Sequence, residues 1–166
     1  DSLQVDIEQE FGVEKFDIII GNPPYNEELL RSGAKPLYHK FIEYYVDKCL
    51  MMSFIVPSRW FSGGIGLDKF RNMMLNRNDI VYMIHFDDAS SIFGNGVQIE
   101  GGVNYFLIVN NYNGMCNYNG TQVKLNNFDI VLQSKYYSIV NKLLGYDKIT
   151  DIYLGRYFGI ETNDKR

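Results

Sequence analysis

Residues 16–25 read Phe-Asp-Ile-Ile-Ile-Gly-Asn-Pro-Pro-Tyr, and this stretch decides the fold of the chain. Its first half is a short apolar run with no polar face, which is typical of a parallel strand buried inside an α/β sheet. Ligand crevices of open α/β sheets lie beyond the carboxyl ends of their strands. The stretch therefore predicts a buried strand over Phe16–Gly21 that leads directly into a ligand-facing turn.

The turn that follows the strand carries the groups expected of an amine-binding site. Each proline fixes its own φ, lacks an N–H and keeps the preceding residue extended, so the Pro23 carbonyl has no helix to join. The Asn22 amide offers a second acceptor, and the Tyr25 ring can stack on a base for about 1–3 kcal/mol. Two adjacent acceptors suit an exocyclic amino group. When both of its N–H groups donate hydrogen bonds to them, the nitrogen lone pair turns away from the ring and can act as a nucleophile.

Alternating apolar runs and amphipathic segments follow the turn. A helix is predicted to open at Pro36 and to bury Leu37, Phe41, Tyr45 and Cys49. The other predicted elements are strands 52–56, 80–86, 103–110 and 122–125 and helices 67–76 and 134–144. Strand–helix alternation predicts the α/β class with right-handed crossovers and a mostly parallel sheet. The segments around 101–102 and 110–120 favour an antiparallel hairpin at its edge.

Composition excludes several classes of protein. The 166 residues are 46% apolar and 22% charged, which suits one soluble globular domain or a piece of one. No apolar run approaches the ~20 residues that span a bilayer, no signal-peptide pattern is present, and two cysteines cannot form a disulfide framework. We expect a cytoplasmic protein without a metal. A net charge of −4 lacks the basic surface of an independent DNA-binding domain.

The stretch FDIIIGNPPY resembles the catalytic motif of amino-methyltransferases that use S-adenosylmethionine, most closely the adenine-specific DNA methyltransferases of restriction–modification systems. The resemblance implies a partial Rossmann-like methyltransferase sheet with Asn22, Pro23, Pro24 and Tyr25 as the catalytic motif. Asn22 and the Pro23 carbonyl would hold the target amine, and Tyr25 would stack on a base flipped out of the duplex.

Later stretches extend the resemblance over nearly the whole chain. Residues 56–75 are similar to the family's second strand–loop–helix unit, and residues 86–109 to its distal part. There Phe93 fits the aromatic residue that stacks on the other face of the adenine, although a core position is the alternative. Residues 157–163 resemble the transition towards a target-recognition region. We therefore assign 1–130 to the target-facing half of a catalytic domain and 131–166 to a helix and tail that lead to a missing recognition region.

The family's main cofactor site is missing from the sequence. It needs an earlier strand with a Gly-rich turn, whereas only fifteen residues precede Phe16. Asn22 would supply a partial cofactor contact, and the implied partner is a missing N-terminal half-domain. We expect the isolated fragment to bind S-adenosylmethionine weakly or not at all and to be inactive. Its first strand would be an unpaired edge, covered by the N-terminal segment or by self-association.

Three functions remain open at this point. The first is a fragment of a DNA adenine methyltransferase that acts on DNA through its parent protein. The second is a methyltransferase on protein glutamine or another amine, since such enzymes also carry Asn-Pro-Pro-Tyr. The third is a non-catalytic fragment used for DNA or protein binding. Arg59 could contact a phosphate or fix its loop, and Asp87 and Asp88 could face the crevice or cap a loop.

Overall fold

The computed structural model describes Leu3, residues 5–27 and residues 35–143. The chain forms two compact units, Asp1–Ser134 and Lys135–Arg166. The first unit contains the whole sheet, and the described part of the second is mainly one helix. The proposed recognition-domain transition at 157–163 lies outside the described residues, and the functional division at residue 130 remains a prediction.

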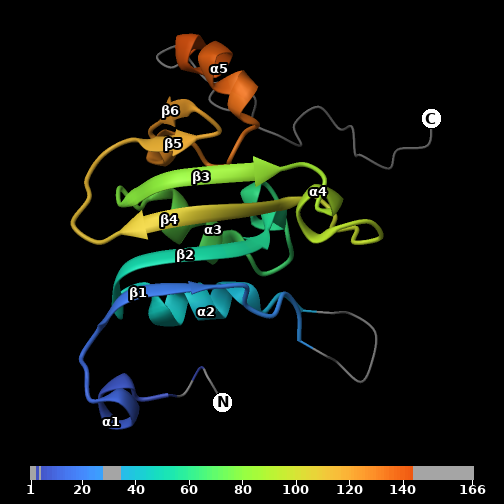
Figure 1. The fold of residues 1–166 in the computed structure, drawn as a ribbon. Helices are drawn as coiled ribbons and strands as arrows, with labels where there is room; N and C mark the ends of the chain where they lie inside the picture. The colour runs from blue at the N-terminus through green and yellow to red at the C-terminus, as the bar shows by residue number, and fades with distance from the viewer. Residues whose placement is uncertain (1–2, 4, 28–34, 144–166) are drawn as a thin grey trace, which may run out of the picture. The chain divides into compact units, whose positions relative to one another are not determined.

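Helices and strands alternate up to β4, after which β5 and β6 follow without an intervening helix (Figure 1). The strands are β1 Phe16–Gly21, β2 Cys49–Pro57, β3 Ile80–Phe86, β4 Val103–Val109, β5 Cys116–Tyr118 and β6 Thr121–Val123. The α-helices are α1 Ile7–Phe11, α2 Tyr38–Tyr45, α3 Asp68–Leu75, α4 Ser90–Phe93 and α5 Tyr137–Leu143. Three 3-10 helices complete the described elements: η1 Ser58–Phe61, η2 Leu125–Asn127 and η3 Ser134–Tyr136.

The sheet confirms the predicted α/β class and its antiparallel edge hairpin. Its strand order is β1-β2-β4-β3-β5-β6, and β5 and β6 form the hairpin at one edge. Strands β1, β2, β3 and β5 run in the same direction. One feature was not predicted: β4 runs antiparallel between β2 and β3, in the interior of the sheet (Figure 1).

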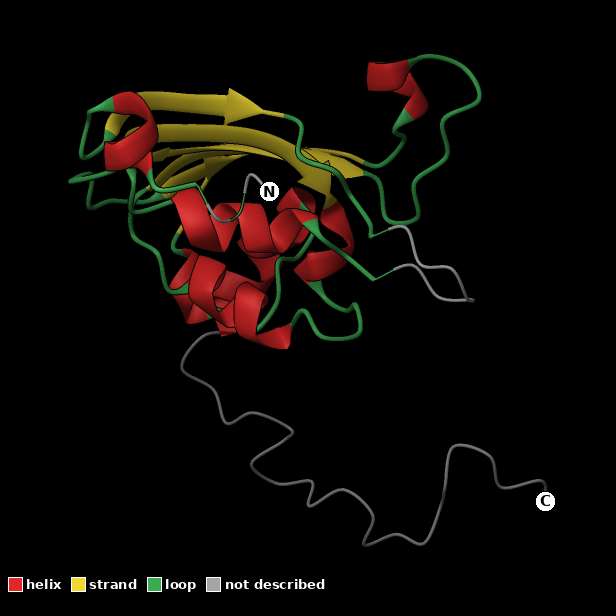
Figure 2. Cartoon of the chain, turned by 90° about the horizontal axis from the view of Figure 1, so that it is seen from below, coloured by secondary structure: helices red, strands yellow, loops and turns green. Residues whose placement is uncertain are grey.

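Helices α2 and α3 cover one face of the sheet (Figures 1 and 2). Each connects two strands that progress in the same direction across the sheet, and right-handed crossovers then place both helices on the same face. The β2 residues that point to this face, Met52, Phe54 and Val56, are buried. The apolar core of the first unit therefore lies between this face and the helices.

The opposite face is open at β1, and this corrects the prediction of a buried strand. Ile18 is 56% exposed and Ile20 is 75% exposed. The apolar character of β1 was recognised correctly, but within the described residues β1 pairs only with β2 and forms the edge of the sheet. An apolar run in the sequence predicts a surface that is stable when buried. It does not show which residues bury that surface.

The described part of the N-terminal segment adds no strand beside β1 and leaves Ile18 and Ile20 exposed. Helix α1 lies near the start of β1, where the Phe11 and Phe16 rings are 5.4 Å apart. The Tyr44 hydroxyl holds the segment by donating to the Val5 carbonyl at 2.8 Å. Self-association at the edge remains a prediction. Among the helices of the described residues, none is long and apolar enough to cross a membrane.

Helix α2 is displaced by one position from its predicted register. It begins at Tyr38, and its buried side carries Tyr38 and Ile42, followed by Val46. The side chains predicted to be buried, Leu37, Phe41 and Tyr45, lie one position earlier on the helix surface and are only half-buried. Both stripes have the four-residue spacing of a helix face, so the spacing alone did not separate them. Cys49, the last residue predicted for this helix, begins β2.

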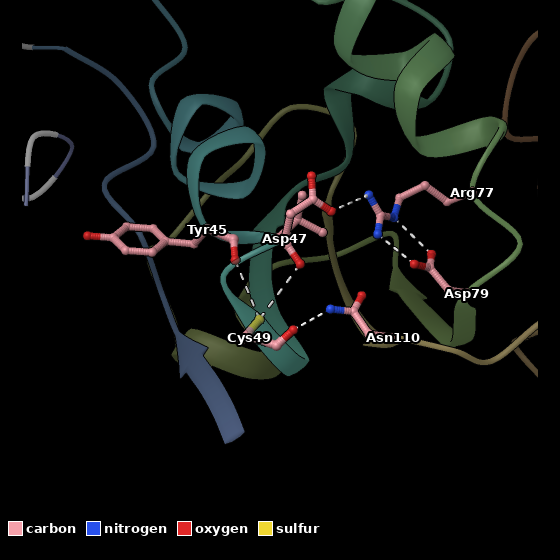
Figure 3. Close-up of polar contacts among 7 residues, drawn as sticks. Tyr45, Asp47, Cys49, Arg77, Asp79 and Asn110 are labelled. Carbon is pink, nitrogen blue, oxygen red and sulfur yellow. Dashed lines mark hydrogen bonds and ion pairs between the residues drawn. The ribbon is translucent and has the colours of Figure 1, made fainter. Parts of the chain in front are cut away.

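A polar cluster ties the amino-terminal ends of β2 and β3 to the end of β4 (Figure 3). Arg77 binds Asp79 through two contacts, of 2.8 and 2.5 Å, and lies 3.8 Å from Asp47. The Asn110 amide donates to the Cys49 carbonyl. These contacts close one end of the sheet and leave the carboxyl ends of β1, β2 and β3 to form a site.

Candidate active site

The Asn-Pro-Pro-Tyr turn begins where β1 ends. Asn22 is exposed, whereas Pro23 is buried. The Tyr25 carbonyl accepts a hydrogen bond from the Leu37 amide at 2.9 Å, which fixes the end of the turn. No described residue donates a hydrogen bond to the Pro23 carbonyl. The turn therefore presents the exposed Asn22 side chain next to a Pro23 carbonyl that has no donor among the described residues.

Tyr25 is half-buried beside Asn22. Its hydroxyl is buried and lies near the Asn22 side chain. Burial raises the pKa of this phenol, and the nearby Asn22 side chain partly opposes that rise. The phenol is consequently neutral at physiological pH, so its ring can contact a neutral base without placing a charge beside it.

Phe93, at the end of α4, lies next to Tyr25. The two ring centroids are 6.5 Å apart, with an angle of 63° between the ring planes. Ile92, the neighbour of Phe93, is 40% exposed, so this segment is not wholly part of the core. The structure thus brings the two predicted stacking residues together from segments almost 70 positions apart. The stacking role itself remains a prediction.

The two aspartates before α4 have local contacts. The Asp88 carboxylate accepts hydrogen bonds from the Ser90 amide at 2.9 Å and from the Ser90 hydroxyl at 2.6 Å. These bonds lower the pKa of Asp88, and Asp88 fits the loop-cap interpretation. Asp87 lies 3.7 Å from His85, whose other ring nitrogen is 3.0 Å from the Gly101 carbonyl. The aspartates thus help to shape the segment that carries Phe93.

A cavity of about 300 Å³ adjoins Tyr25. Its other walls come from α2, from the segment after β2 and from the loop before β4, and they include Tyr38, Pro57, Arg59, Leu67 and Glu100. Arg59 and Glu100 are 3.6 Å apart. Sequence reasoning singled out Arg59 by its place after a strand, but it missed Tyr38 and Glu100, which carry no motif.

The carboxyl end of β1 fits one wall of a cofactor site. Gly21 and Asn22 are exposed there, at the edge of the sheet, and open α/β sheets bind ligands at the carboxyl ends where their strand order reverses. Residues 5–15 contain α1 and the link to β1, without a strand and Gly-rich turn of their own. The partial cofactor contact through Asn22 remains a prediction.

Comparisons with known proteins agree on one group of enzymes. The model of the Eco57I restriction-modification methylase family matches residues 2–93. A protein of Mycoplasma pneumoniae described as an uncharacterized adenine-specific methylase is 33% identical over 110 residues, which are 63% of this chain and 26% of the relative. The chain thus spans about a quarter of that relative's length.

A solved structure supports the fold. The type I restriction-modification methyltransferase subunit from Streptococcus thermophilus has a TM-score of 0.53 at 13% identity. The match covers 89% of this chain and 35% of the subunit. At this identity the likeness concerns the fold alone. It shows that the fold of this chain is similar to part of a methyltransferase subunit.

Proposed function

Because the chain belongs to the Eco57I restriction-modification methylase family, we propose that its parent protein is a DNA adenine methyltransferase. In this proposal the enzyme transfers a methyl group from S-adenosylmethionine to the N6 amino group of an adenine flipped out of the duplex. The observation that carries the proposal is the turn after β1. It brings the exposed Asn22 side chain and a Pro23 carbonyl without a donor among the described residues into the same turn as Tyr25, whose ring lies next to that of Phe93.

The two acceptors of the turn would orient the amine. S-adenosylmethionine, when bound, supplies the methyl group. The Asn22 side-chain oxygen and the Pro23 carbonyl would each accept a hydrogen bond from one N–H of the adenine amine, which directs the nitrogen lone pair away from the ring plane. Pro24 would keep Pro23 extended, so that its carbonyl points to the amine. Catalysis would then come from positioning and from hydrogen bonds made in advance.

The two aromatic rings would hold the base between them. Stacked bases in DNA lie about 3.4 Å apart, so two rings that sandwich a base stand about 6.8 Å apart. The 6.5 Å between the Tyr25 and Phe93 centroids is close to this spacing. The 63° angle between the planes is not parallel, so one ring must turn when the base enters. This pair favours a nucleobase over the glutamine side chain of a protein substrate.

A missing N-terminal half-domain would complete the sheet. New strands beside β1 would satisfy its free edge, and they would lead away from β2. Because strands on this side of β1 would progress across the sheet in the direction opposite to β1–β2, right-handed crossovers would place the connecting helices on the face that α2 and α3 leave open. The exposed Ile18 and Ile20 side chains mark this face. The strand order would then reverse at β1, which places Asn22 at the ligand crevice.

This arrangement can be tested by hydrogen exchange and calorimetry. We expect the β1 amides to exchange slowly in the full-length protein and fast in a protein reduced to residues 1–166. The shorter protein should bind S-adenosylmethionine weakly or not at all. Micromolar affinity of residues 1–166 for S-adenosylmethionine would contradict the missing half-site.

The catalytic proposal is tested by substituting Asn22 in the full-length protein. Asn22→Ala should abolish formation of N6-methyladenine in duplex DNA, while the unfolding midpoint stays unchanged, because Asn22 is exposed. The matched variant Tyr25→Phe keeps the ring and should retain most activity. Near-normal turnover by Asn22→Ala would refute the assignment. Methylation of a glutamine-containing release factor but not of DNA would favour the second function, and methylation of neither would favour a binding role.

A further inference from the structure

We propose that Arg59 and Tyr38 form a phosphate-binding site for the flipped nucleotide, and that Glu100 forms an ion pair with Arg59 until DNA binds. The inference rests on the proposed function, since it concerns the same substrate. The three residues line the cavity beside Tyr25, the ring on which the base would lie. The sugar and phosphate of that nucleotide must pass close to the same ring.

Arg59 is held by a contact that a ligand can replace. It follows β2 in η1, and its side chain is 58% exposed. Its Nη1 atom is 3.6 Å from a Glu100 carboxylate oxygen, and the Glu100 side chain is 85% exposed. Exposed ion pairs contribute about 0–1 kcal/mol. A phosphate can bind the guanidinium through two shorter, parallel hydrogen bonds, which is the stronger geometry.

Tyr38 supplies an independent indication of a ligand. Only 2% of this residue is exposed, and its hydroxyl has no hydrogen-bond partner among the described residues. Buried hydroxyls are normally paired, because an unpaired one costs about 1–3 kcal/mol. Burial raises the pKa of Tyr38 far above its ordinary range, and the nearby Arg59 charge opposes this only in part. The phenol is therefore a proton donor that lacks an acceptor.

Charge distinguishes a phosphate from the edge of a base. Arg59 is the cation in the described cavity lining, and Glu100 is the anion. A neutral ring nitrogen of adenine would compete poorly with the Glu100 carboxylate for the guanidinium, whereas a phosphate carries a full charge of its own. The chain has a net charge of −4, so a local cation is needed wherever a phosphate approaches. A donor hydroxyl beside a cation thus matches an anionic oxygen.

The test measures how DNA affinity depends on salt in the full-length protein. The probe is a methylatable duplex whose target adenine stands opposite an abasic site, because an unpaired base is flipped more easily. Each phosphate contact changes the slope of log K against log salt by about 0.9. Arg59→Ala should reduce the slope by about this amount. Arg59→Lys should keep the slope and lower the affinity, since lysine retains the positive charge but cannot form bidentate hydrogen bonds to a phosphate.

The companion variants separate this role from a structural one. Tyr38→Phe should weaken binding by roughly fivefold to tenfold at every salt concentration, the effect of one hydrogen bond. Glu100→Gln should tighten binding, because the competing carboxylate is gone. Lys15→Ala, an exposed cation at the other end of β1, is the control and should leave the slope unchanged.

The outcomes also distinguish the two proposals. An active wild-type enzyme whose slope is unaffected by Arg59→Ala would overturn the phosphate site and leave the methyltransferase function intact. Loss of discrimination among target bases with an unchanged slope would show that Arg59 reads the base, which also overturns it. A wild-type protein that neither binds nor methylates the duplex would overturn both.

Discussion

Replacing Gly102 by alanine should be far more damaging than replacing its neighbour Gly101. Both glycines lie in the loop before β4, with φ of +72° and +80° respectively. A Cβ at Gly101 would meet nothing closer than the Arg59 backbone nitrogen, at 3.8 Å. A Cβ at Gly102 would lie 2.0 Å from the Phe86 carbonyl oxygen. The two substitutions therefore share a conformational cost and differ in a steric one.

The magnitude follows from these contacts. A left-handed conformation costs a side-chain-bearing residue about 1–2 kcal/mol, which is the whole expected effect of Gly101→Ala. At Gly102 the carbonyl contact must open by more than ~1 Å, since carbon–oxygen contacts normally begin near 3.3 Å. That movement endangers the bonds from Gly102 to Ile99 and from Ser58 to Gly102, each worth about 1 kcal/mol. We expect a total of about 3–4 kcal/mol.

Hydrogen exchange in the full-length protein measures this locally. Gly101→Ala should accelerate exchange of the β3 and β4 amides by about tenfold, and Gly102→Ala by several hundredfold, at about 1.4 kcal/mol per factor of ten. Gly96→Ala, at φ +98° in open space, is a second control for the conformational cost. Equal effects of Gly101→Ala and Gly102→Ala would refute the steric argument.

Three further predictions concern the aromatic pair, a buried thiol and the polar cluster. Phe93→Ala should lower kcat/KM for duplex DNA by roughly 5- to 150-fold, the value of one stacked base, while Phe93→Tyr retains most activity in the same methyl-transfer assay. Burial raises the pKa of Cys116 from 9.0 to about 12, so native protein should resist iodoacetamide at pH 8 and react once urea unfolds it. Because the folded-state pKa is the higher one, this thiol favours folding below pH 9 and loses that contribution between about pH 9 and 12, as urea midpoints can show. Asp79→Asn should cost about 1.5–3 kcal/mol of unfolding free energy by breaking the two-pronged contact with Arg77, whereas the exposed Asp47→Asn should be nearly neutral.

Strands with a simple apolar pattern could be predicted to the residue. The bounds of β1 and β3, Phe16–Gly21 and Ile80–Phe86, agree with the sequence prediction because polar or turn-forming residues flank each apolar run. The predicted strand at 122–125 was less accurate, since β6 ends at Val123. Strand β5 was missed because its three residues lie within an Asn- and Gly-rich stretch that indicates a turn.

The interior place of β4 could not be predicted from its composition. Its apolar run indicates burial, but the choice of neighbours depends on contacts with residues about 50 positions earlier. The same limit applies to the site. The Asn-Pro-Pro-Tyr turn has a local signature, and Phe93 is proposed from the resemblance. Tyr38 and Glu100 reach the cavity only through the path of the chain, so no local pattern identifies them.

The position of β4 has a consequence for biosynthesis. Met51 pairs with Val109 and Pro57 pairs with Val103, so β2 and β3 are joined only through a strand that leaves the ribosome after both. Such distant pairing requires the closure of long loops and slows folding. We expect nascent chains that end before residue 103 to leave the apolar edges of β2 and β3 unpaired. We therefore expect nascent chains of this length to misassemble most readily and to depend most on chaperones.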